Sequence, residues 1–335
     1  MTPGSPAAAT ENDEIQGGVS AAERAEIEAL RGEAHQTRRA AVPALEEILY
    51  QPIPVLDQGF VRGVDYLGDD GAIVQAARVS YGKGTKTVSS DRGLIRYLMR
   101  HRHTTPFEMC EIKLHVKLPI FVARQWIRHR TANVNEYSAR YSILDHEFYL
   151  PASEQLAPQS TANRQGREGE IPAAEKQKIQ GEIAELSDEA YKLYETLLNE
   201  TQAGEVVDDR RSGLARELAR MVLPTNFYTQ WYWKVDLHNL FHFLSLRADP
   251  HAQYEIRAYA EAICGVVEKW VPMAWGAFED YRLDGVSFSG PALGALRALI
   301  DQTRLEDEAY LESLKAESGL SAREFREFLA SLKGE

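Results

Sequence analysis

The segment CEIKLHVKL, residues 110–118, alternates apolar and polar side chains along its whole length. Cys110 and Leu114 belong to the apolar set, whereas Lys113 and His115 belong to the polar set. Because successive side chains of a strand point to opposite faces of a sheet, this alternation predicts a half-buried β-strand. On this interpretation His115 lies on the solvated face.

Pro119 follows this strand directly, and a proline is well tolerated in the first turn of a helix. We therefore predict that a helix starts at Pro119. Polar residues lie three or four positions apart along it and are expected to share one face. They are Arg124, Gln125, Arg128 and His129.

The next segment, RHRTANVNEYSARYS (residues 128–142), reverses the charge of the protein. Residues 119–142 contain four arginines and one acid, Glu136, a local balance of +3 (4 − 1) in a chain of net charge −12. Guanidinium groups bind phosphate oxygens in pairs. A cationic segment in an acidic chain therefore predicts a pocket for an anion or a nucleotide. The alternative is a helix end with surface salt bridges.

Periodicity and turn residues predict the other elements. Strands are expected at residues 61–67 and 226–235. Helices are expected at residues 71–79, from Ser90 through Met99, at 179–197, 214–222, from Leu237, at 256–270 and at 322–332. Polar loops are expected at residues 81–90 and 153–169, and a loosely attached helix outside the compact part is expected at 21–41.

These elements divide the chain into three parts. Residues 1–50 form an N-terminal extension whose first 20 residues, rich in Ala, Gly, Pro, Ser and acids, predict partial disorder. Residues 51–284 are expected to form the main domain, and residues 285–335 a C-terminal helical extension.

The composition limits the classes of function. A hydrophobic content of 44% is normal for a globular protein with a real core, and a pI near 5.4 argues against a dedicated nucleic-acid binder. Two cysteines are too few for a disulfide framework and fit a reducing cytoplasm. No apolar run reaches membrane-spanning length, and no export signal is evident. We expect a cytoplasmic protein without nucleic-acid or membrane partners.

Few side chains predict metal binding or nucleophilic catalysis. Four histidines, at positions 101, 103, 115 and 129, do not follow a ligand pattern, so no metal site is expected. Cys110 lies on the apolar face of its strand and Cys264 in an apolar helix, which indicates core thiols. Ser138 lacks the Gly-x-Ser-x-Gly elbow of a nucleophilic serine.

Two further segments contain candidate ligand-binding residues. The segment RADPHAQ, residues 247–253, is expected to start a helix, with Asp249 as its N-cap and Pro250 in its first turn. Arg247 would then lie beside the positive end of a helix dipole and favour an anion. The segment HTTPFE, residues 103–108, is either a turn with a proline bend or a polar loop that contacts a ligand.

These segments resemble the flavin-dependent thymidylate synthase family. The family motif is Arg-His-Arg, two residues, Ser, one residue, Asn, two residues, Ser, one residue, Arg-Tyr. The chain matches it at Arg128-His129-Arg130, Asn135, Ser138 and Arg140-Tyr141, and departs from it at Asn133, where Ser is usual. Similar segments are AARVS (76–80), HTTPFE (103–108), FVARQW (121–126), ARMVLP (219–224) and LRADPHAQ (246–253). The resemblance spans roughly residues 55–281.

The resemblance implies a fold and a reaction. The fold is α+β, with a central twisted, mainly antiparallel sheet flanked by long helices, in a homotetramer whose sites lie between subunits. The reaction is the reductive methylation of dUMP to dTMP. In it 5,10-methylenetetrahydrofolate supplies the carbon, FAD carries the hydride and NADPH is the reductant.

The resemblance also implies site residues. Positions similar to those that bind dUMP are Gln125, Arg128, Glu136, Ser138, Ala139, Arg140, Arg220 and Arg247. Positions similar to those around FAD are Ser80, Thr105, Arg128, His129, Arg130, Glu136, Asp236, Leu237, His238 and His242. Arg247 and Ser138 are the expected catalytic residues, because Arg247 matches the arginine that ionises the uracil ring and Ser138 the serine near the pyrimidine.

The implied chemistry is consistent with these residues. Carbon 5 of uracil must become nucleophilic, which many methylases achieve by adding a cysteine to carbon 6. Without an activated cysteine, a guanidinium beside N3 and O4 has to stabilise the developing charge. Two alternatives stay open. One is another flavoenzyme or a nucleotide methyltransferase that acts on a related pyrimidine, and the other is a non-catalytic RNA-binding module that uses the aromatic residues of 227–233.

Overall fold

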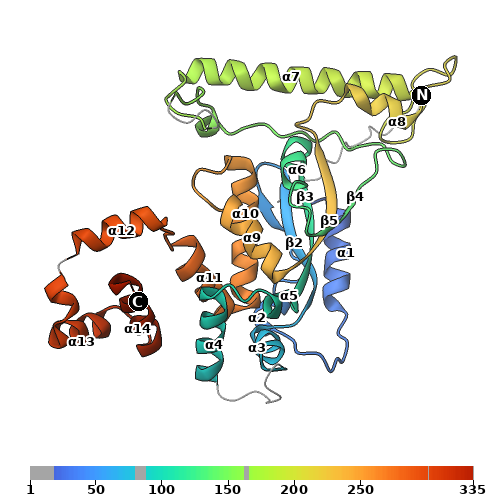
Figure 1. The fold of residues 1–335 in the computed structure, drawn as a ribbon. Coiled ribbons are helices and arrows are strands. Elements are labelled where there is room, and N and C mark those ends of the chain that lie inside the picture. Colours follow the sequence, from blue (N-terminus) through green and yellow to red (C-terminus); the bar gives the residue numbers. More distant parts are fainter. Residues whose placement is uncertain (1–18, 80–87, 162–165, 301, 335) are drawn as a thin grey trace, which may run out of the picture. The chain divides into compact units, whose positions relative to one another are not determined.

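A computed structural model describes residues 19–79, 88–161, 166–300 and 302–334 of the chain. The chain divides into two compact units, Met1–Leu283 and Asp284–Glu335. The first, the main unit, is built on one antiparallel sheet of five strands in the order β1-β2-β3-β5-β4, flanked by helices (Figure 1). The strands are β1 (Ile53–Val55), β2 (Gly59–Leu67), β3 (Glu111–Pro119), β4 (Asn133–Glu136) and β5 (Tyr228–Asp236). The predicted α+β class with an antiparallel sheet is confirmed.

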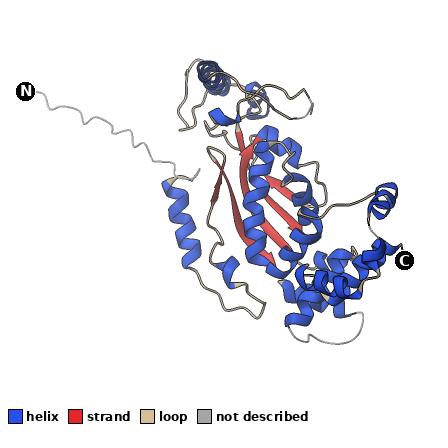
Figure 2. Ribbon diagram, turned by 90° about the vertical axis from the view of Figure 1, so that its left-hand side faces the viewer, coloured by secondary structure: helices blue, strands red, loops and turns tan. Residues whose placement is uncertain are grey.

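β3 is the central strand, and it pairs with β2 on one side and β5 on the other. Its apolar side chains, which include Ile112 and Leu114, are fully buried. They belong to one large core with the side chains of α9 (Leu237–Arg247) and α10 (Tyr254–Trp270). Figure 2 shows these helices packed over one face of the sheet. The alternation of residues 110–118 thus identifies the face on which the core forms.

The opposite face of β3 is not fully solvated. Lys113 is only partly buried, but His115 and Lys117 are buried. Part of this face is covered near the helix α1 (Ala21–Gly32), whose Ile27 packs against Phe60 of β2. The prediction of a solvated His115 is therefore wrong, because a helix distant in the sequence excludes water from one half of this face.

His115 occupies a polar site within this covered face. The Nε–H group of Arg62 donates a hydrogen bond of 2.9 Å to its Nδ1 atom, and the Tyr232 ring stacks on the imidazole with centroids 4.9 Å apart. Burial, and next the guanidinium of Arg62, lower the pKa of His115 from 6.5 to about 4. The imidazole is therefore neutral and accepts the hydrogen bond from Arg62.

This pKa predicts a pH-dependent stability. Between pH 6.5 and about pH 4 the unfolded chain protonates His115 while the folded chain does not, so lowering the pH favours unfolding. We expect this histidine to reduce the free energy of unfolding by up to about 3 kcal/mol across that window. In His115→Gln, where an amide oxygen can still accept from Arg62, urea denaturation at about pH 7 and about pH 4.5 should show a smaller loss. An unchanged pH dependence would refute this assignment.

The other helices of the main unit include several predicted ones and three short helices, at residues 43–46, 105–108 and 272–278, that were not predicted. They are α2 (Pro43–Glu46), α3 (Asp70–Val79), α4 (Val88–Arg100), α5 (Thr105–Glu108), α6 (Ile120–Trp126), α7 (Ala173–Leu198), α8 (Arg216–Ala219) and α11 (Pro272–Phe278), with 3₁₀ turns at Ser153–Gln155 and Arg220–Val222 and a π-helical turn at Glu279–Leu283. None of the described helices is long and apolar enough to span a membrane.

Several predicted boundaries were wrong. The N-terminal helix ends at Gly32 rather than near residue 41, and the helix predicted at 214–222 is only a short α-helix followed by a 3₁₀ turn. α4 begins at Val88, so the end of the loop predicted at 81–90 is helical, and the rest of that loop lies outside the described residues. The predicted range is too long because residues 214 and 215 are not helical and residues 220–222 form a 3₁₀ turn, which ends before Pro224.

A second, smaller core lies under α7. Tyr191, Tyr194 and Leu198 of α7 are buried together with Phe227 and Ala139. The Tyr191 hydroxyl donates to the carbonyl oxygen of Leu144 at 2.8 Å. These contacts fix the loop that follows β4, because that loop packs between α7 and the start of β5.

The C-terminal unit is helical. It contains α12 (Gly290–Leu299), a 3₁₀ turn (Gln302–Leu305), α13 (Glu308–Glu317) and α14 (Ala322–Lys333). Ser321 and Glu324 form a capping box at the start of α14, and Arg297 of α12 donates two hydrogen bonds to the carbonyl oxygen of Ser331 at 3.1 and 2.6 Å. These contacts connect the first and last helices of this unit.

Candidate functional site

The cationic segment 128–142 runs along the edge of the sheet. α6 ends at Trp126, so Arg128 and His129 lie in the turn beyond the helix and not on its polar face as predicted. The chain then forms β4, an edge strand paired with β5, and turns again from Ser138. The segment thereby presents two groups of side chains, one at each end of β4.

Trp126 anchors the first group in the core. Its ring is fully buried, stacks on Phe243 with centroids 4.6 Å apart, and meets Trp231 and Trp233 edge to face. The neighbouring Gln125 has a buried Oε1 atom without a hydrogen-bond partner in the described structure. Buried acceptors are nearly always satisfied in native proteins, so this buried oxygen is an exception.

Arg247 lies against His129. The Nε–H group of Arg247 donates to the Nε2 atom of His129 at 3.0 Å, although the two residues are far apart in the sequence. Arg247 is the last residue of α9, and α10 begins only at Tyr254. The prediction that residues 247–253 start a helix is therefore wrong. Arg247 lies at the negative end of a helix dipole, where a cation is stabilised.

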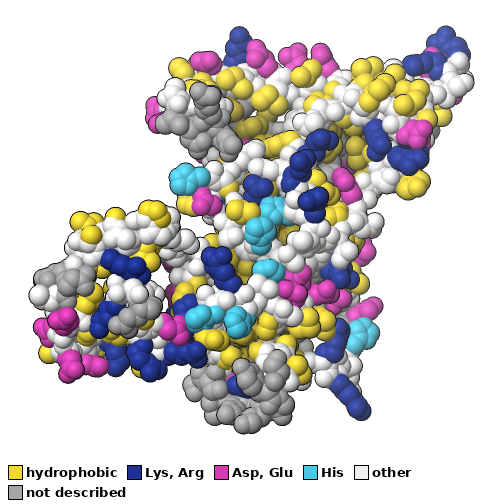
Figure 3. Space-filling view, in the orientation of Figure 1, with side chains coloured by type: hydrophobic (Ala, Val, Ile, Leu, Met, Phe, Trp, Pro, Cys, Tyr) yellow, Lys and Arg dark blue, Asp and Glu magenta, His cyan; other side chains and the backbone are white. Residues whose placement is uncertain are grey.

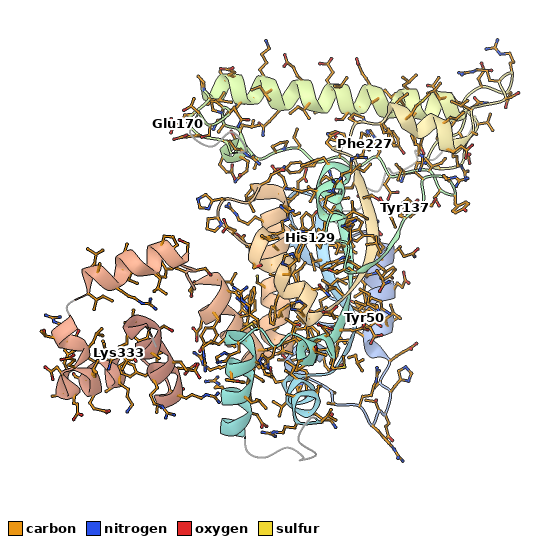
Figure 4. The ribbon with its side chains drawn as sticks, in the orientation of Figure 1. Tyr50, His129, Tyr137, Glu170, Phe227 and Lys333 are labelled. Atoms are coloured by element: carbon orange, nitrogen blue, oxygen red, sulfur yellow. The ribbon has the colours of Figure 1, made fainter. Side chains whose placement is uncertain are left out.

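The protonation states of this pair are fixed by their surroundings. Burial, and next the charge of Arg247 and the neighbouring His242, lower the pKa of His129 from 6.5 to about 4. Burial also lowers the pKa of Arg247 from its usual value, but an arginine stays protonated in proteins. The pair therefore combines a neutral imidazole, which accepts through Nε2, with a partly desolvated guanidinium. Figure 4 shows His129 near the middle of the main unit, below Phe227 and α7.

The second group lies beyond β4. The Ser138 hydroxyl oxygen accepts a hydrogen bond of 3.3 Å from the backbone N–H of Arg140, and Ala139 is buried between them. The Arg140 guanidinium pairs with Glu217 at 3.2 Å, and Arg220 donates to the Glu217 carbonyl oxygen at 3.4 Å. Glu217 thus brings the two arginines together.

Within the described part of the chain, no hydrogen bond joins Arg140 or Arg220 to Arg247. Surface salt bridges were the alternative to an anion pocket for the cationic segment. Arg140 forms one, with Glu217, whereas Arg128 and Arg130 are exposed and form no ion pair among the described residues. Glu136 lies on the edge strand β4, between the two groups. Its carboxylate accepts a hydrogen bond of 2.9 Å from the hydroxyl of buried Thr229. Figure 3 shows basic and histidine side chains gathered in the middle of this face of the main unit.

A cavity of about 300 Å³ lies next to the Arg247–His129 pair. His238 and His242, one turn apart on α9, line it, and the His242 ring lies 5.9 Å from the His129 ring. Thr104 lines it too, whereas the predicted Thr105 is the exposed first residue of α5.

Two other positions implied to surround FAD have structural contacts. The Asp236 carboxylate caps α9 by accepting from the Asn239 backbone at 2.9 Å, and Leu237 is fully buried in the core. Ser80 lies outside the described residues.

Two arginines of this cavity were not among the predicted site residues: Arg102, before α5, and Arg282, in the π-helical turn after α11. His103 and Thr104 belong to the polar loop recognised as a possible ligand contact, which was a usable signal. No local pattern marks Arg102 or Arg282.

The structure also bears on the alternatives. Trp231, Trp233, Phe227 and Tyr228 are buried, so of the aromatic residues at 227–233 only Tyr232 could stack on a base. Burial raises the pKa of both cysteine thiols, Cys110 and Cys264, to about 12, which leaves them protonated and poor nucleophiles. These findings argue against RNA binding and against thiol catalysis by either residue.

Comparisons with known proteins agree with the sequence motifs. Residues 64–273 match the family described as thymidylate synthase complementing protein. The flavin-dependent thymidylate synthase of Rickettsia bellii is 56% identical over 298 residues, which cover 89% of this chain and 99% of that protein. The enzyme of the same name from Ruegeria pomeroyi is 58% identical over 310 residues, 92% of this chain and 97% of that protein.

A solved structure has a similar fold. The UMP/dUMP methylase PolB from Streptomyces cacaoi, bound with 5-Br dUMP, is 34% identical, with a TM-score of 0.60 over 69% of this chain and 98% of that chain. Its complex with 5-Br UMP gives a TM-score of 0.57 at 35% identity, over 66% of this chain and 93% of that chain. The family match covers more than half of the chain, and the relatives are similar over nearly their full length. This chain therefore belongs to the flavin-dependent thymidylate synthase family of enzymes.

Proposed function

We propose that this enzyme converts dUMP to dTMP with 5,10-methylenetetrahydrofolate as the carbon donor, FAD as the flavin and NADPH as the reductant. The observation that carries the proposal is the hydrogen bond of 3.0 Å between Arg247 and His129, which joins the cationic segment to the end of α9. It brings together two residues that the family motifs place at the substrate and at the flavin.

Arg247 has the properties required to activate uracil. Its guanidinium is partly desolvated, and charges interact more strongly where water is excluded. Beside N3 and O4 of the pyrimidine it would stabilise the negative charge that develops when carbon 5 becomes nucleophilic. Neutral His129 would orient the guanidinium by accepting a hydrogen bond from the Nε–H group of Arg247. The other N–H groups of Arg247 would then be left for the substrate. No thiol is needed for this step, and Ser138 would act from the neighbouring turn.

The second group would hold the substrate phosphate. Arg140 and Arg220 present two guanidinium groups around Glu217, and paired forks suit phosphate oxygens. Arg128 and the buried Oε1 atom of Gln125 would contact the nucleotide from the other group. We further propose that a second copy of the chain supplies one group to the other's site in a homotetramer.

The residues beside the pair fit a flavin. The cavity next to His129 has aromatic walls, and its lining contains histidines and arginines but no Asp or Glu, which suits a planar ring with an anionic diphosphate. When bound, the flavin supplies the hydride that completes the methyl group. His238 and His242 would contact it from α9, and His129, Arg130 and Glu136 from the cationic segment.

Two measurements test the proposal: the visible absorption spectrum of the purified protein and tritium release from labelled dUMP. The purified protein should show a flavin absorption band that bleaches with NADPH. With methylenetetrahydrofolate it should release tritium from carbon 5 of labelled dUMP. A colourless protein that takes up no FAD, or a yellow one that releases no tritium, would end the proposal.

The similarity to PolB favours one second candidate, methylation of UMP. Labelled UMP assayed beside labelled dUMP separates the two. We expect preference for dUMP, and faster release from UMP would assign the chain to the second reaction.

A further inference from the structure

The cavity beside His129 is formed by three parts of the main unit that are distant in the sequence. The turn between α4 and α5 supplies Arg102 and His103, α9 supplies His238 and His242, and the π-helical turn after α11 supplies Arg282. Figure 1 shows α4, α5, α9 and α11 together in the lower part of the main unit. Three phenylalanines form its apolar wall, in which Phe241 and Phe278 stack with centroids 4.3 Å apart.

The polar lining of the cavity is cationic. It contains two arginines and three histidines and no Asp or Glu, in a chain with 50 acids and 38 lysines and arginines. Arg102 has a left-handed backbone, with φ of 57°, which is uncommon for a residue other than glycine. Such conformations cost about 1 kcal/mol or more, and they cluster at ligand-binding sites.

The two arginines repel one another. Burial, and next the charge of Arg102, lower the pKa of Arg282 from its usual value. Arg282 donates from Nη2 to the carbonyl oxygen of Met99 at 3.2 Å. Among the residues that the structure describes, no carboxylate pairs with either guanidinium. Two adjacent cations without a counter-ion are stabilised by a bound anion.

We propose that Arg102 and Arg282 form a subsite for the anionic tail of an aromatic cosubstrate or cofactor. The flat phenylalanine wall accommodates a ring, and the paired guanidinium groups bind the phosphates of a dinucleotide or the carboxylates of a folate. Arg282 lies beyond residue 273, where the family match ends, so this subsite extends the site that the family motifs define. The inference rests on the proposed function of the same site.

The experiment uses pairs of probes that differ in their anionic tails. They are NADP⁺ and nicotinamide riboside, monoglutamyl folate and pterin, and FAD and riboflavin, each titrated into the full chain by calorimetry. In Arg102→Gln and Arg282→Gln, we expect the more anionic member of one pair to bind about tenfold more weakly, and its partner to bind nearly as before. The pair that responds identifies the source of the tail.

Controls separate this subsite from general effects of charge and folding. Arg210→Gln removes the same charge from an exposed side chain on another part of the chain. It should leave all six affinities unchanged. Arg282→Lys, which keeps the charge, should recover part of the binding. Circular dichroism reports folding, and if Arg282→Gln unfolds, exposed Arg102 still permits the test.

The outcomes distinguish two kinds of failure. Wild-type binding that neither arginine substitution weakens would overturn the subsite and leave the proposed function intact. Equally weaker binding of both members of every pair would also overturn the subsite, because the arginines would then not bind the anionic tail specifically. A wild-type protein that binds none of the probes would refute the proposed function itself.

Discussion

Replacing Arg247 with alanine is expected to reduce turnover by about 100- to 1,000-fold, because a preorganised cation would no longer stabilise the charge that forms on the pyrimidine. The affinity for dUMP should fall by less than about tenfold, since other arginines hold the phosphate. Single-turnover kinetics and equilibrium binding of dUMP measure the two effects separately. Equal losses in both would mean that Arg247 only anchors the substrate.

The contact with His129 provides an independent readout for this prediction. In Arg247→Ala the repulsion that helps to lower the pKa of His129 disappears, so that pKa should rise from about 4 toward 6.5. NMR titration of the histidine ring measures it without any ligand. Arg247→Lys keeps a cation but loses the Nε–H group that donates to His129, so we expect an intermediate turnover. A His129 pKa that does not change in Arg247→Ala would contradict the described contact.

The sequence predicts the elements whose signal is local. β3 was predicted because apolar residues alternate along it, and α7 because apolar residues recur along one side of it. β4 was missed because Asn133–Glu136 carries no such alternation. Its strand conformation comes from pairing with β5, as in the register of Asn135 opposite Tyr232. Because this pairing joins segments that are distant in the sequence, the sequence of the short strand β4 does not indicate it.

Other differences arise where a local signal competes with tertiary structure. Asp249 and Pro250 have the features of a helix start, but Asp249 instead accepts a hydrogen bond of 2.7 Å from the His251 backbone in the turn before α10. Arg247 was therefore expected just before the start of a helix, whereas it is the last residue of α9. The burial of His115 has a similar origin, since nothing near β3 indicates that α1 covers it.

The candidate site was predicted mainly through motifs. The motifs named His129 and Arg247, but only the structure shows that they touch. Arg102 and Arg282 could not be predicted, because neither belongs to a recognised segment and their proximity depends on the packing of α11 against α4. Periodicity reports which face of an element is buried, and it carries no information about which polar ends meet.

Trp126→Ala is expected to lower the free energy of unfolding by about 3–5 kcal/mol, the usual cost of deleting a large aromatic side chain from a core. Trp126 is fully buried and contacts Trp231, Trp233 and Phe243. Chemical denaturation followed by circular dichroism measures the loss. Trp126→Phe is the matched control. The indole Nε1 atom has no hydrogen-bond partner in the described structure, so phenylalanine loses volume and no hydrogen bond. Its cost should be clearly smaller.

The same substitution also tests how the core positions the site. Trp126 is the last residue of α6, between Gln125 and the turn that carries Arg128 and His129, and Phe243 contacts both its ring and the His129 imidazole. A cavity at Trp126 should therefore displace His129 from Arg247. Displacements of about 1 Å in a catalytic group can cost about 100-fold in rate. We expect Trp126→Ala to lose turnover even at temperatures where it remains folded, while Trp126→Phe keeps most of it. Wild-type turnover in a folded Trp126→Ala would show that the backbone of the turn, and not the packed indole, holds His129 in place.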